Sequence, residues 1–165
     1  MKQPPIISII GKSGSGKTTL VEKLIRELKN RGFKVGTIKH SRHEFQFDRK
    51  GKDSWRHQAA GADTTIIATM GKIGMVKYEN TESIDALAKY FTDMDLVLAE
   101  GYKKEKRPKI EIVRKATGKK PIFINDENNI NLIAVVSDMD LEIDVPKFAL
   151  DDAVKLVDFI VDKYL

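Results

Sequence analysis

Cysteine is missing from this chain of 165 residues, so neither a disulfide framework nor a thiolate zinc site is possible. Long apolar runs are missing too, since none approaches the roughly 20 residues that a membrane-spanning helix needs. The first five residues lack the charged and then apolar pattern of a secretory signal, and they lead straight into a predicted strand. We therefore expect a cytoplasmic protein with no membrane partner.

The motifs of common nucleic-acid-binding modules are also missing: we find no helix-turn-helix signature, no aromatic RNP motif and no zinc finger. What the chain does have is an excess of positive charge, with 29 Lys and Arg against 24 Asp and Glu and a formal net charge of +5. Such a balance favours attraction to phosphates or to an acidic partner. We do not expect nucleic acid among the partners.

A glycine-rich stretch near the start of the chain matches the phosphate-binding loop pattern G-x-x-x-x-G-K-[ST] at every fixed position. A β-branched run over 6–10 precedes it and an amphipathic helical pattern over 17–31 follows it, which is the strand-loop-helix context that the mechanism requires. A glycine-rich turn with an ordinary surface lysine explains neither the spacing nor the flanking elements. The candidate phosphate-binding residues are Gly11, Lys12, Ser13, Gly14, Ser15, Gly16, Lys17, Thr18 and Thr19.

The chemistry of this loop follows from its residue types. Glycines allow the backbone N–H groups to turn inward around anionic oxygens, and the N-terminus of the following helix adds unpaired donors. Lys17 can reach the β- and γ-phosphates of a nucleotide, and the Thr18 hydroxyl can bind Mg²⁺. We therefore predict a nucleoside triphosphate with Mg²⁺ as the ligand, with Lys17 as a candidate catalytic residue.

The order of the other predicted elements indicates an α/β protein. The strand over 33–39 completes a β-α-β unit, so it should run parallel to the strand over 6–10. The pattern then predicts a helix over 53–60, strands over 64–69 and 74–78, a helix over 84–91, strands over 95–100, 109–113, 121–124 and 133–136, and a last helix from 151 or 152 to 164. We predict one domain, residues 1–165, with the three-layer P-loop NTPase fold and a mostly parallel sheet.

Several details of this fold can be predicted more finely. The strands over 64–69 and 74–78 should form an antiparallel hairpin that makes the sheet mixed on one side, and its exposed edges suit a dimer contact. The alternation over 109–113 places that strand nearer an edge. We expect helix caps at Asp53 or Ser54 and at Thr81 or Ser83. The buried face of the last helix should contain Ala153, Val154, Val157, Phe159, Ile160 and Val161.

Two carboxylates are candidate metal ligands. Glu100 ends an apolar strand, where P-loop proteins place the acid that holds a magnesium-bound water or orients the attacking water. We favour this role over that of a solvated strand-end residue and count Glu100 among the candidate catalytic residues. Asp48 could reach the same metal if its loop folds over the phosphates, but it could equally be a surface aspartate.

A second polar pair, Ser137 and Asp138, follows a strand late in the chain. An aspartate in this place can accept hydrogen bonds from the N1 and 2-amino groups of guanine, which adenine does not offer. The full N-K-x-D pattern of many GTPases is absent, so a simple turn residue is an equally good interpretation.

In addition, several blocks of the chain resemble, in order, the molybdopterin-guanine dinucleotide biosynthesis adapter (MobB) family. The blocks are 11–20, 36–40, Asp48 with 51–57, 60–62, 98–103 and 108–111. The resemblance covers nearly the whole chain, and the blocks 51–57 and 100–103 are more specific than the P-loop. It implies a GTP-binding homodimer with weak intrinsic hydrolysis, which assists the guanylyltransferase that joins GMP to molybdopterin. It also carries over residues 11–19 as the phosphate site and Glu100 as the strand-end acid.

Two other functions remain open from the residues alone. A small-molecule kinase would use the same loop with an arginine-bearing lid, for which Arg107 and Arg114 are the available residues. A metallochaperone GTPase would bind nickel or zinc through His40 and His43. The sequence also leaves open whether the protein is an enzyme in its own right; at most we expect a weak GTPase.

Overall fold

The computed structural model describes residues 3–41, 48–122 and 131–165. These divide into two compact units, one formed by residues 1–40 and 83–165 and the other by residues 41–82. Each unit is described by itself. Within the described ranges, no helix is long and apolar enough to span a membrane.

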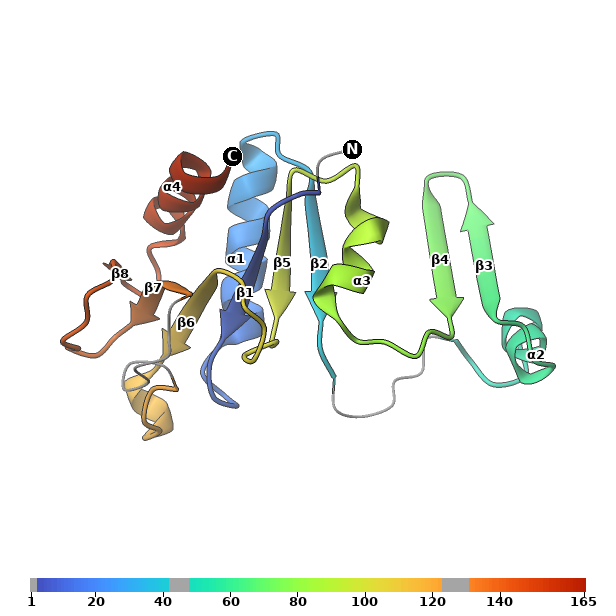
Figure 1. Ribbon diagram of the computed structural model, residues 1–165, viewed down its shortest axis with the longest axis horizontal. Coiled ribbons are helices and arrows are strands. Elements are labelled where there is room, and N and C mark those ends of the chain that lie inside the picture. Colours follow the sequence, from blue (N-terminus) through green and yellow to red (C-terminus); the bar gives the residue numbers. More distant parts are fainter. Residues whose placement is uncertain (1–2, 42–47, 123–130) are drawn as a thin grey trace. The chain divides into compact units, whose positions relative to one another are not determined.

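The first unit is built on a six-stranded sheet in the order β2-β5-β1-β6-β7-β8. All five strand pairs are parallel, as Figure 1 shows for the arrows at the centre. The strands are β1 (Ile6–Ile10), β2 (Val35–Lys39), β5 (Leu96–Glu100), β6 (Lys109–Val113), β7 (Leu132–Ser137) and β8 (Lys147–Phe148). Since parallel strands end at the same edge of a sheet, the residues after β1, β5, β6 and β7 share that edge.

Helices cover both faces of this sheet. Alternate residues of the central strands point to opposite faces, so Ile7 and Ile9 pack in one core cluster and Ile6 in the other. The larger cluster lies under α1 (Lys17–Asn30) and α4 (Ala153–Tyr164), and the smaller under α3 (Ile84–Leu87) and the 3-10 turn η1 (Ala88–Phe91). This is the predicted three-layer α/β architecture with a mostly parallel sheet.

The second unit holds the antiparallel hairpin. Strands β3 (Thr64–Thr69) and β4 (Lys72–Lys77) pair in register from Thr69 with Lys72 to Thr64 with Lys77, and α2 (Asp53–Ala59) precedes them. The hairpin was predicted, but it forms a two-stranded sheet of its own and does not make the main sheet mixed. The connection is also tighter than predicted, because only Met70 and Gly71 lie between the paired strands.

The predicted edge position of residues 109–113 is wrong. Strand β6 lies between β1 and β7, and all five of its residues are buried. The two charged side chains that produced the alternation are satisfied inside the protein: Lys109 Nζ donates to the carbonyls of Glu105 and Arg107, and Glu111 Oε1 accepts from the Ile122 amide at 2.6 Å. Burial lowers the pKa of Lys109 below its ordinary value of 10.5.

Other predictions need smaller corrections. Helix α2 begins after Lys52, and α3 after Ser83, without a side-chain capping bond at either start. Val154 is exposed, whereas Leu156, which we did not predict, is buried in the core. The short strand β8 was not predicted, and residues 123–124 of the predicted strand 121–124 lie outside the described residues.

Candidate functional site

The phosphate-loop pattern lies between β1 and α1 in the first unit, as the sequence predicts. Gly11 must be glycine there, because a Cβ atom would lie 2.6 Å from both the Ile112 carbonyl oxygen and the Ser15 Oγ. Gly16 precedes α1 with φ +95°, in the left-handed region that favours glycine. The two glycines therefore let the loop fold tightly against β6 and turn into the helix.

This fold leaves a row of amide donors at the start of α1. The Ser15 amide closes a turn onto the Lys12 carbonyl at 3.2 Å, and the Leu20 amide makes the first helical bond, to Gly16, at 2.9 Å. Among the described residues, no backbone acceptor contacts the amides from 16 to 19. Free N–H groups at a helix N-terminus, together with the helix dipole, form an anion-binding site.

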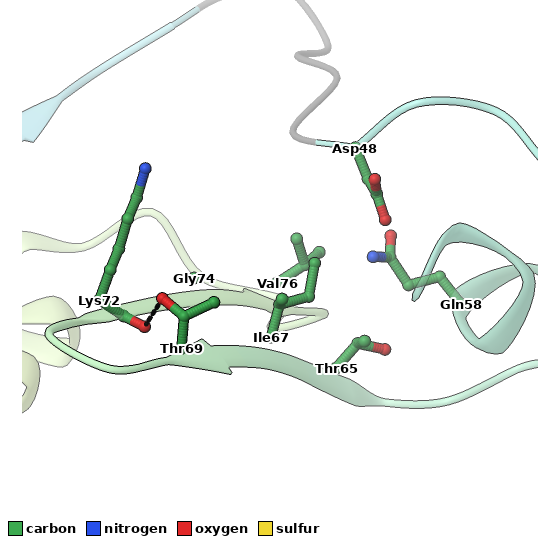
Figure 2. A pocket seen from close by; sticks show the side chains of 8 residues that line it. All are labelled: Asp48, Gln58, Thr65, Ile67, Thr69, Lys72, Gly74 and Val76. Carbon is green, nitrogen blue, oxygen red and sulfur yellow. Dashed lines mark hydrogen bonds between the residues drawn. The ribbon is translucent and has the colours of Figure 1, made fainter. Parts of the chain in front are cut away.

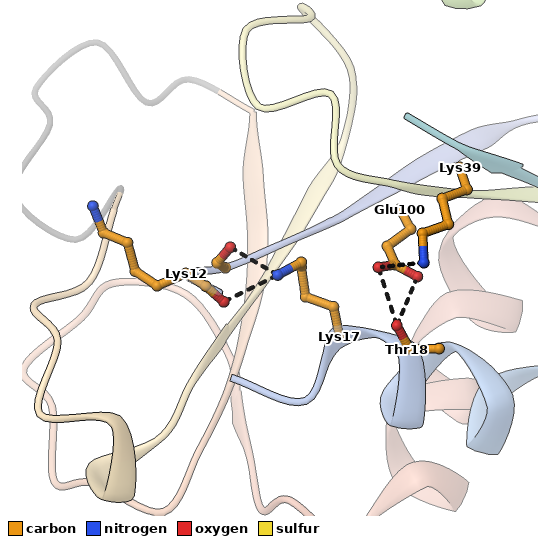
Figure 3. A network of polar contacts seen from close by, with 6 residues as sticks. Lys12, Lys17, Thr18, Lys39 and Glu100 are labelled. Carbon is orange, nitrogen blue, oxygen red and sulfur yellow. Dashed lines mark hydrogen bonds and ion pairs between the residues drawn. The ribbon is translucent and has the colours of Figure 1, made fainter. Parts of the chain in front are cut away.

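Lys17 supplies a positive charge to the same place. Its Nζ donates to the carbonyls of Gly11 at 3.1 Å and Lys12 at 3.0 Å (Figure 3). Partial burial lowers the pKa of Lys17 below its ordinary value of 10.5; Glu100 opposes this shift, and three nearby lysines, among them Lys39, reinforce it. An incoming polyanion would relieve both the burial cost and the repulsion between ammonium groups.

Thr18 and Glu100 meet at the end of β5. The Thr18 hydroxyl lies 3.1 Å from each carboxylate oxygen of Glu100, and Lys39 Nζ, at the end of β2, lies 3.8 Å from Glu100 Oε1 (Figure 3). A hydroxyl and a carboxylate side by side are oxygen donors of the kind that Mg²⁺ prefers, directly or through water. These two residues fit a magnesium ion beside the loop. Lys39 was not predicted, because its place next to Glu100 depends on the pairing of β2 with β5.

Ser137 and Asp138 lie at the end of β7, and both make local contacts. Ser137 Oγ accepts from the Met139 amide at 3.0 Å, and Asp138 Oδ1 accepts from the Lys115 amide at 2.7 Å. Asp138 thus fixes the segment that follows β6, where the 3-10 turn η2 (Lys115–Thr117) begins. Its predicted contact with guanine stays a prediction.

Asp48 belongs to the second unit. Its Oδ1 accepts from the Arg49 amide at 2.7 Å. A hydrogen bond from the Ser54 side chain, and after it the Arg49 amide, lowers the pKa of Asp48 below its ordinary value of 3.8. The carboxylate is therefore ionised at neutral pH, but its role as a metal ligand stays a prediction.

The hairpin and α2 enclose a hollow of about 280 Å³ in the second unit. Figure 2 shows Asp48 and Gln58 at one end of it and Thr69 and Lys72 at the other, with the apolar side chains of Ile67 and Val76 between them. Within the described part of the chain, Asp48 Oδ2 and Thr65 Oγ1 are buried without a hydrogen-bond partner. The hollow is mostly apolar.

The residues proposed for a metallochaperone or a kinase make other contacts. His40 packs against the Tyr102 ring at a centroid distance of 5.0 Å, and His43 lies outside the described residues. The described ranges contain no group of three or more His, Cys, Asp and Glu that could hold a metal ion. Arg107, one of the two candidate lid arginines, forms an ion pair with Asp85.

With the geometry in place, comparison with known proteins identifies the family. The family model described as molybdopterin guanine dinucleotide synthesis protein B, MobB, matches residues 6–138. The chain belongs to the MobB family. The matched MobB segment contains the whole phosphate loop, Glu100 and Asp138.

Individual MobB-family proteins match along nearly the full chain. A molybdopterin-guanine dinucleotide biosynthesis adapter protein of Haemophilus influenzae is 43% identical, over 96% of this chain and 88% of the relative. Its counterpart of the same name in Escherichia coli is 36% identical, over 96% of this chain and 92% of the relative. The crystal structure of Bacillus subtilis MobB superposes with a TM-score of 0.76 at 30% identity, covering 98% of both chains. The predicted fold and family are therefore confirmed.

Proposed function

We propose that this MobB-family chain is an adapter of molybdopterin-guanine dinucleotide biosynthesis that binds GTP with Mg²⁺ and assists the attachment of GMP to molybdopterin. The observation that supports this best is the loop itself: the free amides at the start of α1, the Lys17 ammonium and the Thr18–Glu100 pair lie together. The names of its relatives indicate the pathway, and the loop offers the groups that bind phosphate and Mg²⁺, which such an adapter needs.

Each residue of the loop has a definable task in this proposal. The amides from 16 to 19 donate to phosphate oxygens, and Lys17 exchanges its two carbonyl acceptors for oxygens of the β- and γ-phosphates. Mg²⁺, when bound, neutralises charge on the phosphates. Glu100 accepts a hydrogen bond from the Thr18 hydroxyl and can orient a water at the same place.

Asp138 is the proposed selector of guanine. One of its oxygens accepts from the Lys115 amide, and among the described residues no donor contacts the other, which can accept from the guanine edge. Asp138→Asn keeps the size of the side chain but offers a donor, so we expect it to lower the preference for GTP over ATP. Equal preference in the variant and the wild type would remove Asp138 from the site.

The hairpin is the proposed dimer contact. One of its faces contains Ile66, Ala68, Ile73 and Met75 in paired register, and Ile66 and Ile73 are 58% and 71% exposed. Exposed apolar faces of this kind mark interaction surfaces. We propose a homodimer formed through this hairpin, with the guanylyltransferase and molybdopterin as the further partners, in the cytoplasm.

The proposed function can be tested by calorimetry and by turnover. We expect the protein to bind GTP with Mg²⁺ more tightly than ATP, to hydrolyse GTP slowly alone, and to raise the yield of dinucleotide when added to the guanylyltransferase of this pathway. Absence of nucleotide binding would overturn the proposal. Fast solitary turnover, or phosphoryl transfer to an added alcohol, would favour an independent enzyme such as a kinase.

A further inference from the structure

A second, smaller hollow lies beside the phosphate loop. It is lined by Lys12 and Ser15 of the loop, by the end of β6, and by the segment 114–121 that contains η2. Figure 3 shows the Lys12 side chain pointing away from Lys17, Thr18 and Glu100. The Lys12 side chain therefore turns away from Lys17 and lines the hollow.

The hollow carries an excess of positive charge. Four cationic side chains line it: Lys12, Arg114, Lys119 and Lys120. Lys119 Nζ donates to the Ser13 carbonyl at 2.9 Å, while within the described ranges no acceptor contacts the side-chain nitrogens of the other three. The acid in the lining, Glu111, is engaged with the Ile122 amide. Such a concentration of like charge favours an anion.

A buried hydroxyl points to the same ligand. Ser15 is only 2% exposed, and its Oγ has no hydrogen-bond partner among the described residues. Buried polar groups in folded proteins are normally satisfied, and each exception calls for a ligand, a water or a functional reason. A hydroxyl can donate to an anionic oxygen, which would satisfy Ser15.

The segment 114–121 is fixed in place rather than loosely attached. Asp138 Oδ1 holds the Lys115 amide at 2.7 Å, Thr117 Oγ1 donates to the Arg114 carbonyl at 2.8 Å, and Glu111 holds the Ile122 amide at 2.6 Å. A site held in its binding geometry loses less entropy when it binds. The cations are therefore set beside the loop before any ligand arrives.

We propose that this hollow binds the phosphate group of a second substrate, a phosphomonoester, beside the nucleotide. Its volume is about 10 Å³, which admits one oxygen-sized group and no ring. A phosphate would place one oxygen inside near Ser15 and the others at the rim near Arg114, Lys12 and Lys120. The proposal rests on the proposed function, because the two halves of a dinucleotide join through their phosphates and the half that receives GMP must present one.

The test is a titration of the ¹⁵N-labelled protein with methyl phosphate, followed by NMR, while a non-hydrolysable GTP analogue and Mg²⁺ saturate the loop. We expect saturable shifts of the amides of Ser15, Arg114 and Lys119. Removing two charge-assisted contacts in Arg114→Ala/Lys120→Ala should weaken methyl phosphate binding by about tenfold or more. Affinity for the GTP analogue should fall much less than affinity for methyl phosphate, because Arg114 only borders the loop, with Nη1 3.9 Å from the Cβ position of Gly16.

The matched control, Lys104→Ala/Lys106→Ala, removes two exposed lysines that do not line the hollow, and should leave methyl phosphate binding unchanged. Three results would overturn the proposal: no shifts once the loop is filled, equal weakening in the control, or loss of the GTP analogue from Arg114→Ala/Lys120→Ala. If the GTP analogue does not bind the wild type, the proposed function fails separately. In that case, methyl phosphate is titrated into Lys17→Ala to test the second site alone. Shifts of the Arg114 and Lys119 amide signals would support the second site, and their absence would overturn it.

Discussion

Replacing Lys17 by alanine should remove most of the affinity for nucleotide while leaving the fold intact. Lys17 Nζ makes two hydrogen bonds to neutral carbonyls at 3.1 and 3.0 Å, and binding would exchange these for anionic phosphate oxygens. A lysine hydrogen bond to an anionic phosphate oxygen is stronger than one to a neutral carbonyl, and hydrogen bonds that involve a charged group contribute about 1.5–3 kcal/mol. Loss of the Lys17 contact to the phosphates should therefore cost about 1.5–3 kcal/mol, a loss of roughly 10- to 150-fold in affinity.

Stability should change little in the same variant. Burial of the ammonium is the largest cause of its lowered pKa, so the charge is unfavourable where it lies without a ligand. The assay is calorimetric titration with GTP and Mg²⁺, with a thermal melt of each protein in the absence of nucleotide. The control is Lys155→Ala, which removes an exposed lysine paired with Asp152 on α4. Wild-type affinity in Lys17→Ala would refute the reasoning, as would a loss of binding that merely follows a large drop in melting temperature.

Three further predictions follow from other contacts. Gly11→Ala should lower the melting temperature by roughly 5–10 °C through overpacking of about 2–3 kcal/mol. Gly14→Ala adds the backbone strain of a φ of +82° but places no atom within 4 Å of the new Cβ, so it should lower the melting temperature less; equal melting temperatures would contradict this. Ile66→Glu on the open hairpin face should shift sedimentation from dimer to monomer, and an unchanged dimer would exclude that face. The contribution of Asp48 to stability should be complete above pH 3.8 and disappear as pH falls through its lower folded-state pKa; acid unfolding of Asp48→Asn should lack this component.

Much of the fold could be predicted because the signals are local. The glycine spacing of the loop, the β-branched run before it and the helical periodicity after it depend on neighbouring residues, and the structure places all three as predicted. The burial of Lys109 and Glu111 depends instead on carbonyls and an amide supplied by other segments. Alternating charge there indicated an exposed edge, and only the folded chain shows that those charges are satisfied inside.

In the candidate site, too, some residues could be predicted from local sequence and others depend on the fold. Lys17 and Thr18 follow from the motif, and Glu100 from its place at the end of an apolar strand. Lys39 and Lys119 reach the site from strand pairing and from the segment after β6, which no sequence spacing encodes. Arg114, Lys119 and Lys120 stand close together in the sequence, but their position beside the loop required the structure.

The central claim is that the free amides at the start of α1 donate hydrogen bonds to the phosphates of a guanine nucleotide. The most direct measurement is a ¹⁵N NMR titration of the wild-type protein with GTP and Mg²⁺. We predict large, saturable shifts of the amides of Gly16, Lys17, Thr18 and Thr19, with smaller changes around Glu100. Unchanged amide signals from residues 16–19 at saturating GTP and Mg²⁺ would contradict the account.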